Sequence, residues 1–438
     1  MTAIPKSFSI KSFGCQMNVY DGERMAELLS ATGLSPAAPG EEPDLVVLNT
    51  CHIREKAAEK AYSDVGRMRR EDGSKPLIAL AGCVAQAEGA EAMTRSKMID
   101  LVVGPQAYHR LPELVAAAAR GTRPVDTDMP ALSKFDRLPQ RKRVGPSAFL
   151  TVQEGCDKFC TYCVVPYTRG AEISRPAAAI VAEAEALVAG GAREIILLGQ
   201  NVNAWADGDL ALAGLVRTLA RIERLERIRF TTSHPADMDD ALIAAFADLP
   251  KLMPYLHLPV QSGSDPILKA MNRSHSVESY LRTIERVRAA RPDIAISGDF
   301  IVGFPGETDA DFEATLTIVD AVRYAAAYSF KYSPRPGTPA ATMENQIPAS
   351  VMDHRLQRLQ ARLAGHSLAF NRACIGRDTR ILVDRVGRRP GQMIGKSPWL
   401  QSVFVETDAP IGAMLDVSIT QALPNSLGAT GARRADAA

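Results

Sequence analysis

Short apolar runs alternate with helical patterns over most of this 438-residue chain. Near the N-terminus the runs are SFSIKSFG, DLVVLN and PLIALA, each followed by a helical pattern, and Ile99–Val103 makes a fourth. Strands that alternate with helices in this way favour a parallel sheet with helices on both faces. We therefore predict a doubly wound parallel-sheet α/β domain over residues 1–122.

A polar, proline-containing stretch interrupts this alternation, and we predict a linker over residues 123–145. Between Lys134 and Arg143 it carries five Lys or Arg residues against one Asp. Two interpretations of this basic stretch remain open, a solvated linker and a segment that faces RNA.

The alternation then resumes, and six strands with short connections predict a partial (β/α)6 barrel over residues 146–373. In such a barrel, chemistry gathers at the C-terminal ends of the strands. The predicted strands are Phe149–Gln153, Glu194–Leu198, Ile228–Thr232, Tyr255–Val260, Ile294–Ile301 and Ala327–Tyr332.

The last part of the chain, residues 375–438, has short alternating segments separated by Gly and Pro turns. The segments Thr379–Asp384, Gln401–Glu406 and Met414–Thr420 predict a small antiparallel β-barrel. The final residues, GATGARRADAA, have the composition of a disordered tail.

Composition limits where the protein works and what it binds. No run of 18 apolar residues and no basic segment before an apolar stretch is present, so we expect a cytoplasmic protein without a membrane span. A reducing compartment directs attention to metal or catalytic roles for the seven cysteines. The net charge of +1 means that any RNA binding depends on local basic patches.

Three cysteines stand close together in GCDKFCTYC, namely Cys156, Cys160 and Cys163, just after the first predicted barrel strand. A structural zinc site needs four ligands, and the nearest preceding histidine is His109. The bacterial ferredoxin pattern has another spacing and a fourth cysteine. Three thiolates on a four-iron cluster leave one iron open to a small molecule.

Cys15, Cys51 and Cys83 are isolated in the sequence, but each lies one or two residues beyond a predicted parallel strand. Their spacings, 36 and 32 residues, match successive βα units. Because the carboxyl ends of neighbouring parallel strands line one crevice, we predict that these three cysteines converge. Cys374 has no companion, and we interpret it as a core residue.

The stretch GCDKFCTYCVVPYTRG resembles the signature of radical S-adenosylmethionine (radical SAM) enzymes, in particular the MiaB-type tRNA methylthiotransferases. The resemblance covers nearly the whole chain, including FGCQMN, LNTCHIRE, AGCVAQ, HLPVQSGSD, FIVGFPGET and a C-terminal barrel similar to a TRAM domain. It implies that Cys156, Cys160 and Cys163 hold the [4Fe-4S] cluster that cleaves SAM. It also implies a second, auxiliary [4Fe-4S] cluster on Cys15, Cys51 and Cys83.

For the activity, the resemblance implies insertion of a methylthio group at C2 of an isopentenylated adenosine beside the anticodon of tRNA. One SAM would donate the methyl group and another would supply the 5′-deoxyadenosyl radical. The partners implied are tRNA, an electron donor and a sulfur source, and we expect a monomer.

Candidate SAM contacts follow or end the barrel strands, although each residue serves equally well in a turn or cap. They are Gln200, Asn201, Ser233, Gln261, Ile301 and Gly303, the glycine allowing close backbone approach to adenine.

Candidate RNA contacts lie mostly in a predicted loop, DRVGRRPGQMIGKSPW, which a solvated barrel turn also explains. Basic charge beside an aromatic ring suits phosphate contacts and base stacking. The residues are Arg385, Arg388, Arg389, Lys396 and Trp399, with Arg169 in YTRG as a contact to SAM or RNA.

Two alternatives remain. One is a sister methylthiotransferase that acts on a threonylcarbamoylated adenosine or a ribosomal-protein aspartate. The other is a non-catalytic iron–sulfur protein that binds RNA and senses redox state.

Overall fold

The structure is a computed structural model that describes residues 5–52, 55–69, 73–129, 134–141 and 144–435. Contacts divide the chain into two compact units. The first comprises Met1–Lys142, Glu154–Asp157 and Cys163–Glu172, and the second comprises Arg143–Gln153, Lys158–Tyr162 and Ile173–Ala438. The small C-terminal barrel therefore packs in the same unit as the central βα part.

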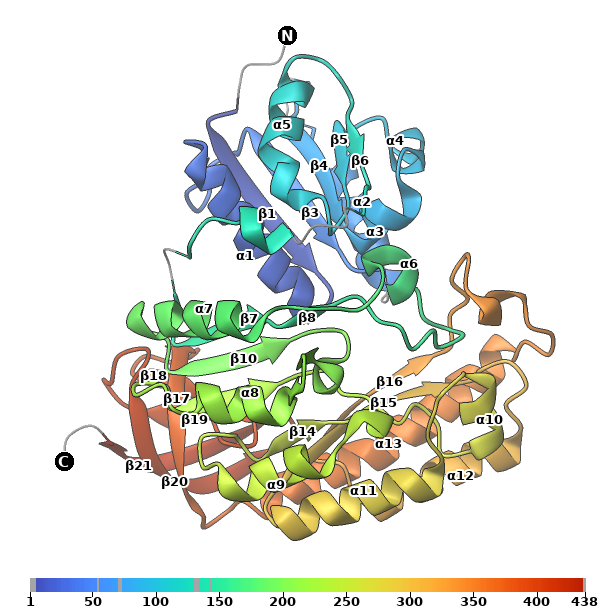
Figure 1. Cartoon of the computed structure of the whole chain (residues 1–438), viewed down its shortest axis with the longest axis vertical. Coiled ribbons are helices and arrows are strands. Elements are labelled where there is room, and N and C mark those ends of the chain that lie inside the picture. Colours follow the sequence, from blue (N-terminus) through green and yellow to red (C-terminus); the bar gives the residue numbers. More distant parts are fainter. Residues whose placement is uncertain (1–4, 53–54, 70–72, 130–133, 142–143, 436–438) are drawn as a thin grey trace. The chain divides into compact units, whose positions relative to one another are not determined.

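The first unit is built on a parallel sheet of order β2-β1-β3-β4-β5-β6 (Figure 1). Every neighbouring pair of its strands is parallel. Because β2 and β3 lie on opposite sides of β1, the strand order reverses at β1. In α/β sheets, ligands bind outside the carboxyl ends of the strands at such a switch point. The strands are β1 (Ser7–Phe13), β2 (Ser35–Pro36), β3 (Leu45–Thr50), β4 (Leu77–Gly82), β5 (Leu101–Val103) and β6 (Val125–Asp126).

Helices cover both faces of this sheet, as the alternating pattern predicted. Leu28 of α1 and Val115 of α5 pack with Val47 on one face. Val65 of α2 and Val84 of α3 pack in a separate core on the other. The helices are α1 (Gln16–Ala31), α2 (Glu55–Gly66), α3 (Cys83–Glu88), α4 (Glu91–Arg95), η1 (Tyr108–Arg110), α5 (Leu111–Ala119), η2 (Lys134–Arg137) and α6 (Val165–Arg169).

The predicted linker is more ordered than its composition suggested. Its start forms β6, the sixth strand of the sheet. Lys134 is only 2% exposed, so the interpretations of a solvated or RNA-facing side chain are wrong for this residue. Lys142 and Arg143 of the basic run lie outside the described residues.

The second unit contains the six predicted barrel strands in two parallel sheets, of order β13-β10-β7 and β14-β15-β16. A single parallel bridge between Ile228 and Leu252 lies between them. The strands are β7 (Ser147–Thr151), β10 (Glu194–Leu198), β13 (Arg227–Phe230), β14 (Tyr255–His257), β15 (Ala295–Val302) and β16 (Ala326–Lys331), with β8 (Gln153–Glu154), β9 (Ile173–Ser174), β11 (Ala206–Asp207) and β12 (Leu210–Ala211) as short additions.

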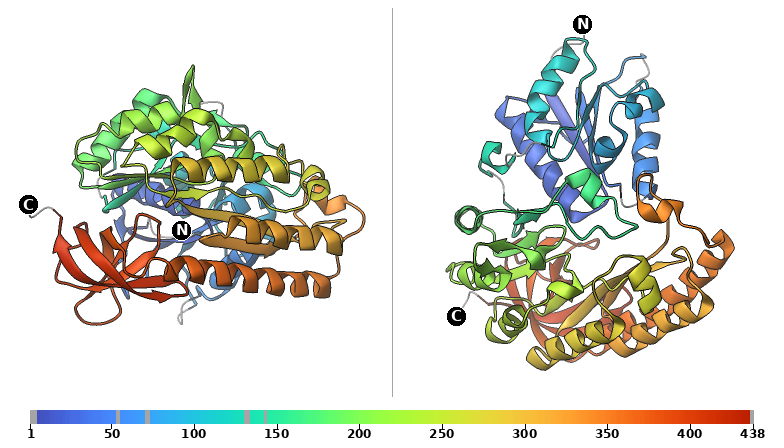
Figure 2. Two further views of the ribbon diagram at one scale, coloured as in Figure 1. Left: turned by 90° about the horizontal axis from the view of Figure 1, so that it is seen from below. Right: turned by 45° about the vertical axis from the view of Figure 1, so that its right-hand side comes forward.

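Helices pack on the outer side of these strands, and the 24-residue α13 extends this layer from the small barrel (Figure 2). No predicted element corresponds to α13, whose Leu359 and Leu363 enter the core. The helices are α7 (Ala177–Ala189), α8 (Leu212–Leu219), α9 (Asp240–Asp248), α10 (Asp265–Ala270), α11 (Val277–Ala290), α12 (Asp309–Val322) and α13 (Ala349–Arg372), with η3 (Val202–Ala204), η4 (Pro235–Asp237) and η5 (Pro339–Thr342).

The C-terminal region forms a closed barrel of order β17-β18-β19-β21-β20. All its neighbours are antiparallel except β19 and β21, which pair in parallel. The strands are β17 (Asp378–Val386), β18 (Gln392–Lys396), β19 (Ser402–Glu406), β20 (Met414–Leu423) and β21 (Ser426–Arg434).

Two predictions for this region are wrong. GATGARRADAA is not a tail over its whole length, because β21 uses most of it to close the barrel. The predicted loop DRVGRRPGQMIGKSPW is a hairpin between β17 and β18. Among the described residues, no helix is long and apolar enough to span a membrane.

Candidate metal centres and cofactor site

Strand register brings the three N-terminal cysteines to one edge of the sheet. Phe13 of β1 pairs with Thr50 of β3, and Thr50 pairs with Gly82 of β4. Cys15 caps the N-terminus of α1, Cys51 directly follows β3, and Cys83 is the first residue of α3. The three cysteines are far apart in the sequence, but they therefore follow three adjacent strands at the same edge of the sheet.

Glycine permits the close approach at this edge. Gly14 has a φ of +120°, and a Cβ there would lie 2.1 Å from Cβ of Cys51. Two buried asparagines complete the edge: Nδ2 of Asn18 donates to Oδ1 of Asn49 at 3.0 Å. The Cys15 thiol donates to Oδ1 of Asn18 at 3.0 Å. Neither asparagine is among the predicted site residues, although both occur in the quoted motifs FGCQMN and LNTCHIRE.

The electrostatic surroundings favour a thiolate at Cys15. A hydrogen bond with Cys51 and the charge of Arg169 lower its pKa to about 6, against the effect of burial. Burial raises the pKa of Cys83, an effect that Arg169 opposes by charge and hydrogen bonding. Because metal ligation requires the deprotonated thiol, a cation beside these sulfurs assists it.

Arg169 belongs to a buried group of four charges within the first unit. Its Nη2 lies 2.6 Å from Oδ2 of Asp21, and its Nη1 lies 3.6 Å from Oε1 of Glu154. Nζ of Lys134 lies 2.8 Å from the same Glu154 oxygen. Arg169 ends α6, which packs against α3. With only 3% of its surface exposed, Arg169 offers no guanidinium to RNA, which corrects that part of its predicted role.

The second group of cysteines lies in one loop, whose residues are shared between the two units. Gly155 has a φ of +74°, and a Cβ there would lie 1.9 Å from the Ala171 carbonyl oxygen, so only glycine fits. The Cys156 amide donates to the Gly170 carbonyl at 3.2 Å. In the second unit, Nη1 of Arg273 lies 3.6 Å from the sulfur of Cys160.

The donor chemistry of both cysteine groups fits iron–sulfur clusters. Each group supplies three thiols, and a cation lies near one or more of its sulfurs. Such thiols are suitable ligands for iron–sulfur clusters. In the described part of the chain, no three Cys, His, Asp or Glu side chains already stand in metal-ligand geometry. The thiols of Cys15 and Cys51 instead hydrogen-bond to each other.

The strand ends of the second unit carry polar atoms suited to a small polar ligand such as SAM. The amides of Gln200 and Asn201 donate to Oε1 of Gln153 at 2.9 and 3.1 Å. Nδ2 of Asn201 donates to Oδ2 of Asp237 at 2.7 Å, which leaves its Oδ1 buried without a hydrogen bond. The buried hydroxyl of Ser233 also has no hydrogen-bond partner.

Of the remaining SAM candidates, Ile301 lies in β15, Gly303 directly follows it, and Gln261 forms an isolated bridge with Phe300 of the same strand. Gln261 has a φ of +77°, and its carbonyl accepts from the Ile301 amide at 2.9 Å. At Gly303 a Cβ would lie 2.2 Å from Cγ of Met352. The space opened by this glycine is therefore filled by α13, which corrects the expectation that it admits adenine.

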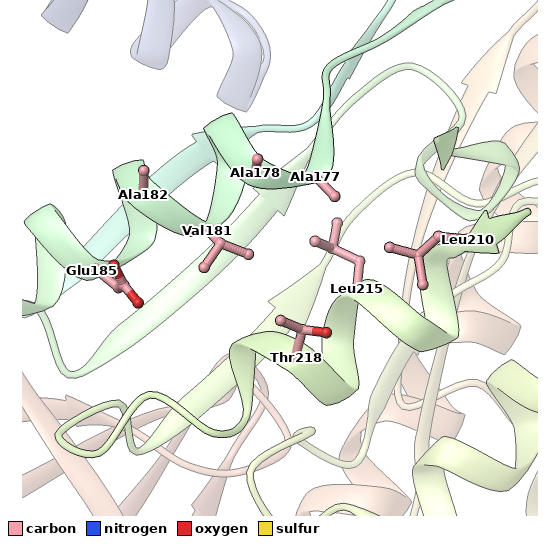
Figure 3. Close-up of a pocket in the computed structure, with 8 residues that line it drawn as sticks. All are labelled: Ala177, Ala178, Val181, Ala182, Glu185, Leu210, Leu215 and Thr218. Carbon is pink, nitrogen blue, oxygen red and sulfur yellow. The ribbon is translucent and has the colours of Figure 1, made fainter. Parts of the chain in front are cut away.

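Hollows in the described part of the second unit include one with an apolar lining and one lined by polar residues. One, of about 410 Å³, lies between α7 and α8 and has a mostly apolar lining (Figure 3); none of the strand-end residues just described lines it. The other, of about 530 Å³, is lined by polar and charged residues that include Asn272 and Arg273. Because these two residues contact the Phe159 carbonyl and the Cys160 sulfur, this second hollow borders the cysteine loop.

The candidate RNA residues separate into exposed and enclosed groups. Arg385, Arg388 and Arg389 are exposed on the β17–β18 hairpin. Nζ of Lys396 donates to Oγ of Ser402 at 2.9 Å, and burial lowers its pKa. Trp399 is 7% exposed and donates from Nε1 to the Asp293 carbonyl, so it presents no free face to a base, contrary to prediction.

Comparison with known proteins agrees with this architecture. Residues 150–319 match the radical SAM superfamily, residues 7–104 match an uncharacterized protein family, UPF0004, and residues 372–430 match the TRAM domain. The chain is similar in fold to the radical S-adenosylmethionine methyltransferase TsrM from Kitasatospora setae, with a TM-score of 0.56 at 15% identity over 78% of this chain and 74% of that one. The cobalamin-dependent radical enzyme OxsB gives a TM-score of 0.53 at 11% identity over 82% of this chain and 56% of that one.

Curated relatives match at much higher identity. The proteins from Sphingopyxis alaskensis and Novosphingobium aromaticivorans are 70% and 67% identical, each over 97% of both chains. The protein from Zymomonas mobilis is 64% identical over 96% of both chains. All three are named tRNA-2-methylthio-N(6)-dimethylallyladenosine synthase. This chain therefore belongs to the tRNA-2-methylthio-N(6)-dimethylallyladenosine synthase family of radical SAM methylthiotransferases.

Proposed function

We propose that this enzyme inserts a methylthio group at C2 of an isopentenylated adenosine next to the anticodon of tRNA. The observation that carries the proposal is the pair of cysteine triads in one chain of this family. The names of the relatives favour this substrate over a threonylcarbamoylated adenosine or a protein aspartate. Because a non-catalytic redox sensor needs no SAM site, the free polar atoms at the barrel strand ends count against that alternative.

In this proposal Cys156, Cys160 and Cys163 hold the [4Fe-4S] cluster that cleaves SAM. When bound, that cluster and SAM supply the radical needed at an unactivated carbon. Asn201 and Ser233 are suited to SAM because each has a buried oxygen without a hydrogen bond, and Gln200, Gln261 and Ile301 lie at neighbouring strand ends.

Cys15, Cys51 and Cys83 are proposed to hold the second [4Fe-4S] cluster, which supplies a site for the sulfur to be transferred. The positive φ of Gly14 lets Cys51 approach, and the Asn18–Asn49 pair ties the first turn of α1 to β3. Arg169 provides a buried positive charge beside the thiolates. One SAM then serves as methyl donor and another as radical source.

The tRNA partner is proposed to contact the exposed arginines of the β17–β18 hairpin, Arg385, Arg388 and Arg389. Exposed guanidinium groups suit the phosphate backbone. That of Arg385 also contacts Asp384 at 2.8 Å, and Lys396 and Trp399 are both less exposed and hydrogen-bonded within the chain. An electron donor and a sulfur source complete the proposed partners, and the enzyme works as a monomer where tRNA is found, in the cytoplasm.

The decisive experiment is nucleoside mass spectrometry of tRNA from cells that lack the protein. The 2-methylthio derivative of isopentenyladenosine should disappear while isopentenyladenosine accumulates. The wild-type gene should restore it, and a Cys156→Ala gene should not. Persistence of the derivative in the deletion strain contradicts the proposal, and loss of a threonylcarbamoyl derivative instead supports the sister activity.

A further inference from the structure

Two aromatic side chains stand on the inner face of the β14–β15–β16 sheet. In the parallel register, Tyr328 of β16 pairs with Asp299 of β15, and Phe330 pairs with Ile301. Because paired residues of parallel strands point to the same face, all four side chains share one face. The intervening residue Phe300 points the other way, into the core beneath the helices.

This inner face is covered at one end of the strands and uncovered at the other. At the N-terminal end, Ala295 and Ala325 pack into the core of the small barrel, and Tyr255 packs against it. Toward the C-terminal end, Tyr328 is 52% exposed and Phe330 is 39% exposed. Exposed aromatic rings that share a face mark a binding surface more often than an isolated exposed residue does.

Polar groups border the Tyr328 ring. The ring of His257 meets that of Tyr328 edge-on, with centroids 6.3 Å apart. Nε2 of His257 lies 3.4 Å from Oδ2 of Asp299, and its Nδ1 lies 3.0 Å from Oγ of Ser297. An imidazole and a carboxylate therefore stand beside an apolar aromatic surface.

We propose that Tyr328 and Phe330 bind the isopentenylated adenine of the substrate nucleoside, with His257 and Asp299 at its polar edge. This assignment rests on the proposed function. The aromatic faces suit both a nucleobase, by stacking, and a branched five-carbon group without hydrogen-bonding atoms. The surface adjoins one of the proposed SAM residues, because Phe330 pairs with Ile301.

The test compares the binding of two anticodon stem-loop RNAs to the reconstituted enzyme under anaerobic conditions, by fluorescence anisotropy. One RNA carries isopentenyladenosine at the target position and the other carries adenosine. For the wild type we expect tighter binding of the isopentenylated RNA. Phe330→Ala and Tyr328→Ala should weaken that binding about tenfold and weaken binding of the adenosine RNA by less, because the adenosine RNA loses base stacking alone and not the contact with the five-carbon group. Tyr328→Phe should retain the preference.

Lys331→Ala is the matched control, because Lys331 lies on the same strand but faces the other way, toward Asp353 of α13. It should bind like the wild type, and all variants should keep their iron content and melting temperature. A preference retained by both alanine variants overturns the assignment alone, as does an equal weakening of the binding of both RNAs. If the wild type itself has no preference, the proposed substrate fails together with the assignment.

Discussion

Cys15 is isolated in the sequence, yet its thiol hydrogen-bonds to Cys51 at the ends of adjacent strands. Its role as a cluster ligand predicts a specific loss on substitution. Cys15→Ala should lower the iron content from about eight to about four atoms per chain, since each cluster holds four. Formation of 5′-deoxyadenosine should continue, whereas methylthio insertion should stop.

Cys374→Ala is the control for this experiment. Cys374 is buried in the core of the small barrel, and its thiol donates to the Phe370 carbonyl at 3.4 Å. Iron content should be unchanged in this variant. Normal methylthio insertion by Cys15→Ala would show that Cys15 is a packing residue and not a cluster ligand.

The contribution of the Arg169 charge to the stability of the protein depends on the charges that it pairs with. Removal of one member of a buried ion pair costs about 3–5 kcal/mol, because the partner charge stays buried. Arg169→Gln should therefore destabilise the apo-protein strongly, since Asp21 and Glu154 keep their charges. Asp21→Asn in the same chain should recover part of the loss, which a double-mutant cycle of urea unfolding measures.

The exposed Arg120, which follows α5, provides the control. Arg120→Gln should change the free energy of unfolding by less than about 0.5 kcal/mol. Additive effects of Arg169→Gln and Asp21→Asn would show that the two charges do not depend on each other.

His275 predicts a pH dependence of stability. Burial and the nearby Arg273 lower its pKa to about 4, whereas an unfolded histidine takes up its proton near pH 6.5. Between these values the unfolded chain binds more protons, so stability should fall as the pH falls from about 6.5 to about 4. His275→Gln should make this decline in melting temperature shallower, while the exposed His354→Gln should leave it as in the wild type.

At the scale of elements, the turn from β1 into α1 depends on a glycine for two separate reasons. Gly14 has a φ of +120° and faces Cβ of Cys51, whereas Gly33 has a φ of +94° with nothing within 4 Å. Gly33→Ala should cost about 1–2 kcal/mol from backbone strain alone. Gly14→Ala should cost more and also lower the iron content, because the clash displaces Cys51. Equal melting temperatures and full iron content in both variants would contradict this account.

Strands were predictable from the sequence where the pattern of apolar residues matches the burial of the strand in the fold. The apolar runs LVVLNT and LIALAG are buried at every position, so their composition alone indicates interior parallel strands. The strands β18 and β21 were missed because QMIGK and SLGATGARR contain glycines and charges typical of turns. Their pairing partners, rather than their own residues, hold them in the barrel.

For the molecule as a whole, two buried arginines join the small barrel to the βα part of the second unit. Arg227 donates to the carbonyls of Lys396 and Arg380, at 2.8 and 2.7 Å. Arg229 donates to those of Pro398 and Ser397, at 2.7 and 2.8 Å. Glu194 balances the charge of Arg229 through a contact of 2.7 Å. These bonds satisfy backbone oxygens that the junction would otherwise bury unpaired.

Arg229→Met should therefore separate the unfolding of the small barrel from that of the βα part. It leaves Glu194 buried without its partner, at a cost of about 3–5 kcal/mol. Calorimetry should show a second, lower transition, and limited proteolysis should cleave the junction faster. Arg224→Met, at an exposed position just before β13, should behave like the wild type. A single unchanged transition in Arg229→Met would contradict this role.

The sequence by itself determined the α/β architecture, the six barrel strands and the placement of each N-terminal cysteine at a strand end. These follow from local periodicity and from the rule that parallel strands share their carboxyl edge. Only the tertiary structure decided that Arg169 and Lys134 are buried ion-pair partners, that Trp399 is enclosed, and that Met352 fills the space beside Gly303. The physical reason is that burial and charge pairing depend on residues distant in the chain, which no local pattern specifies.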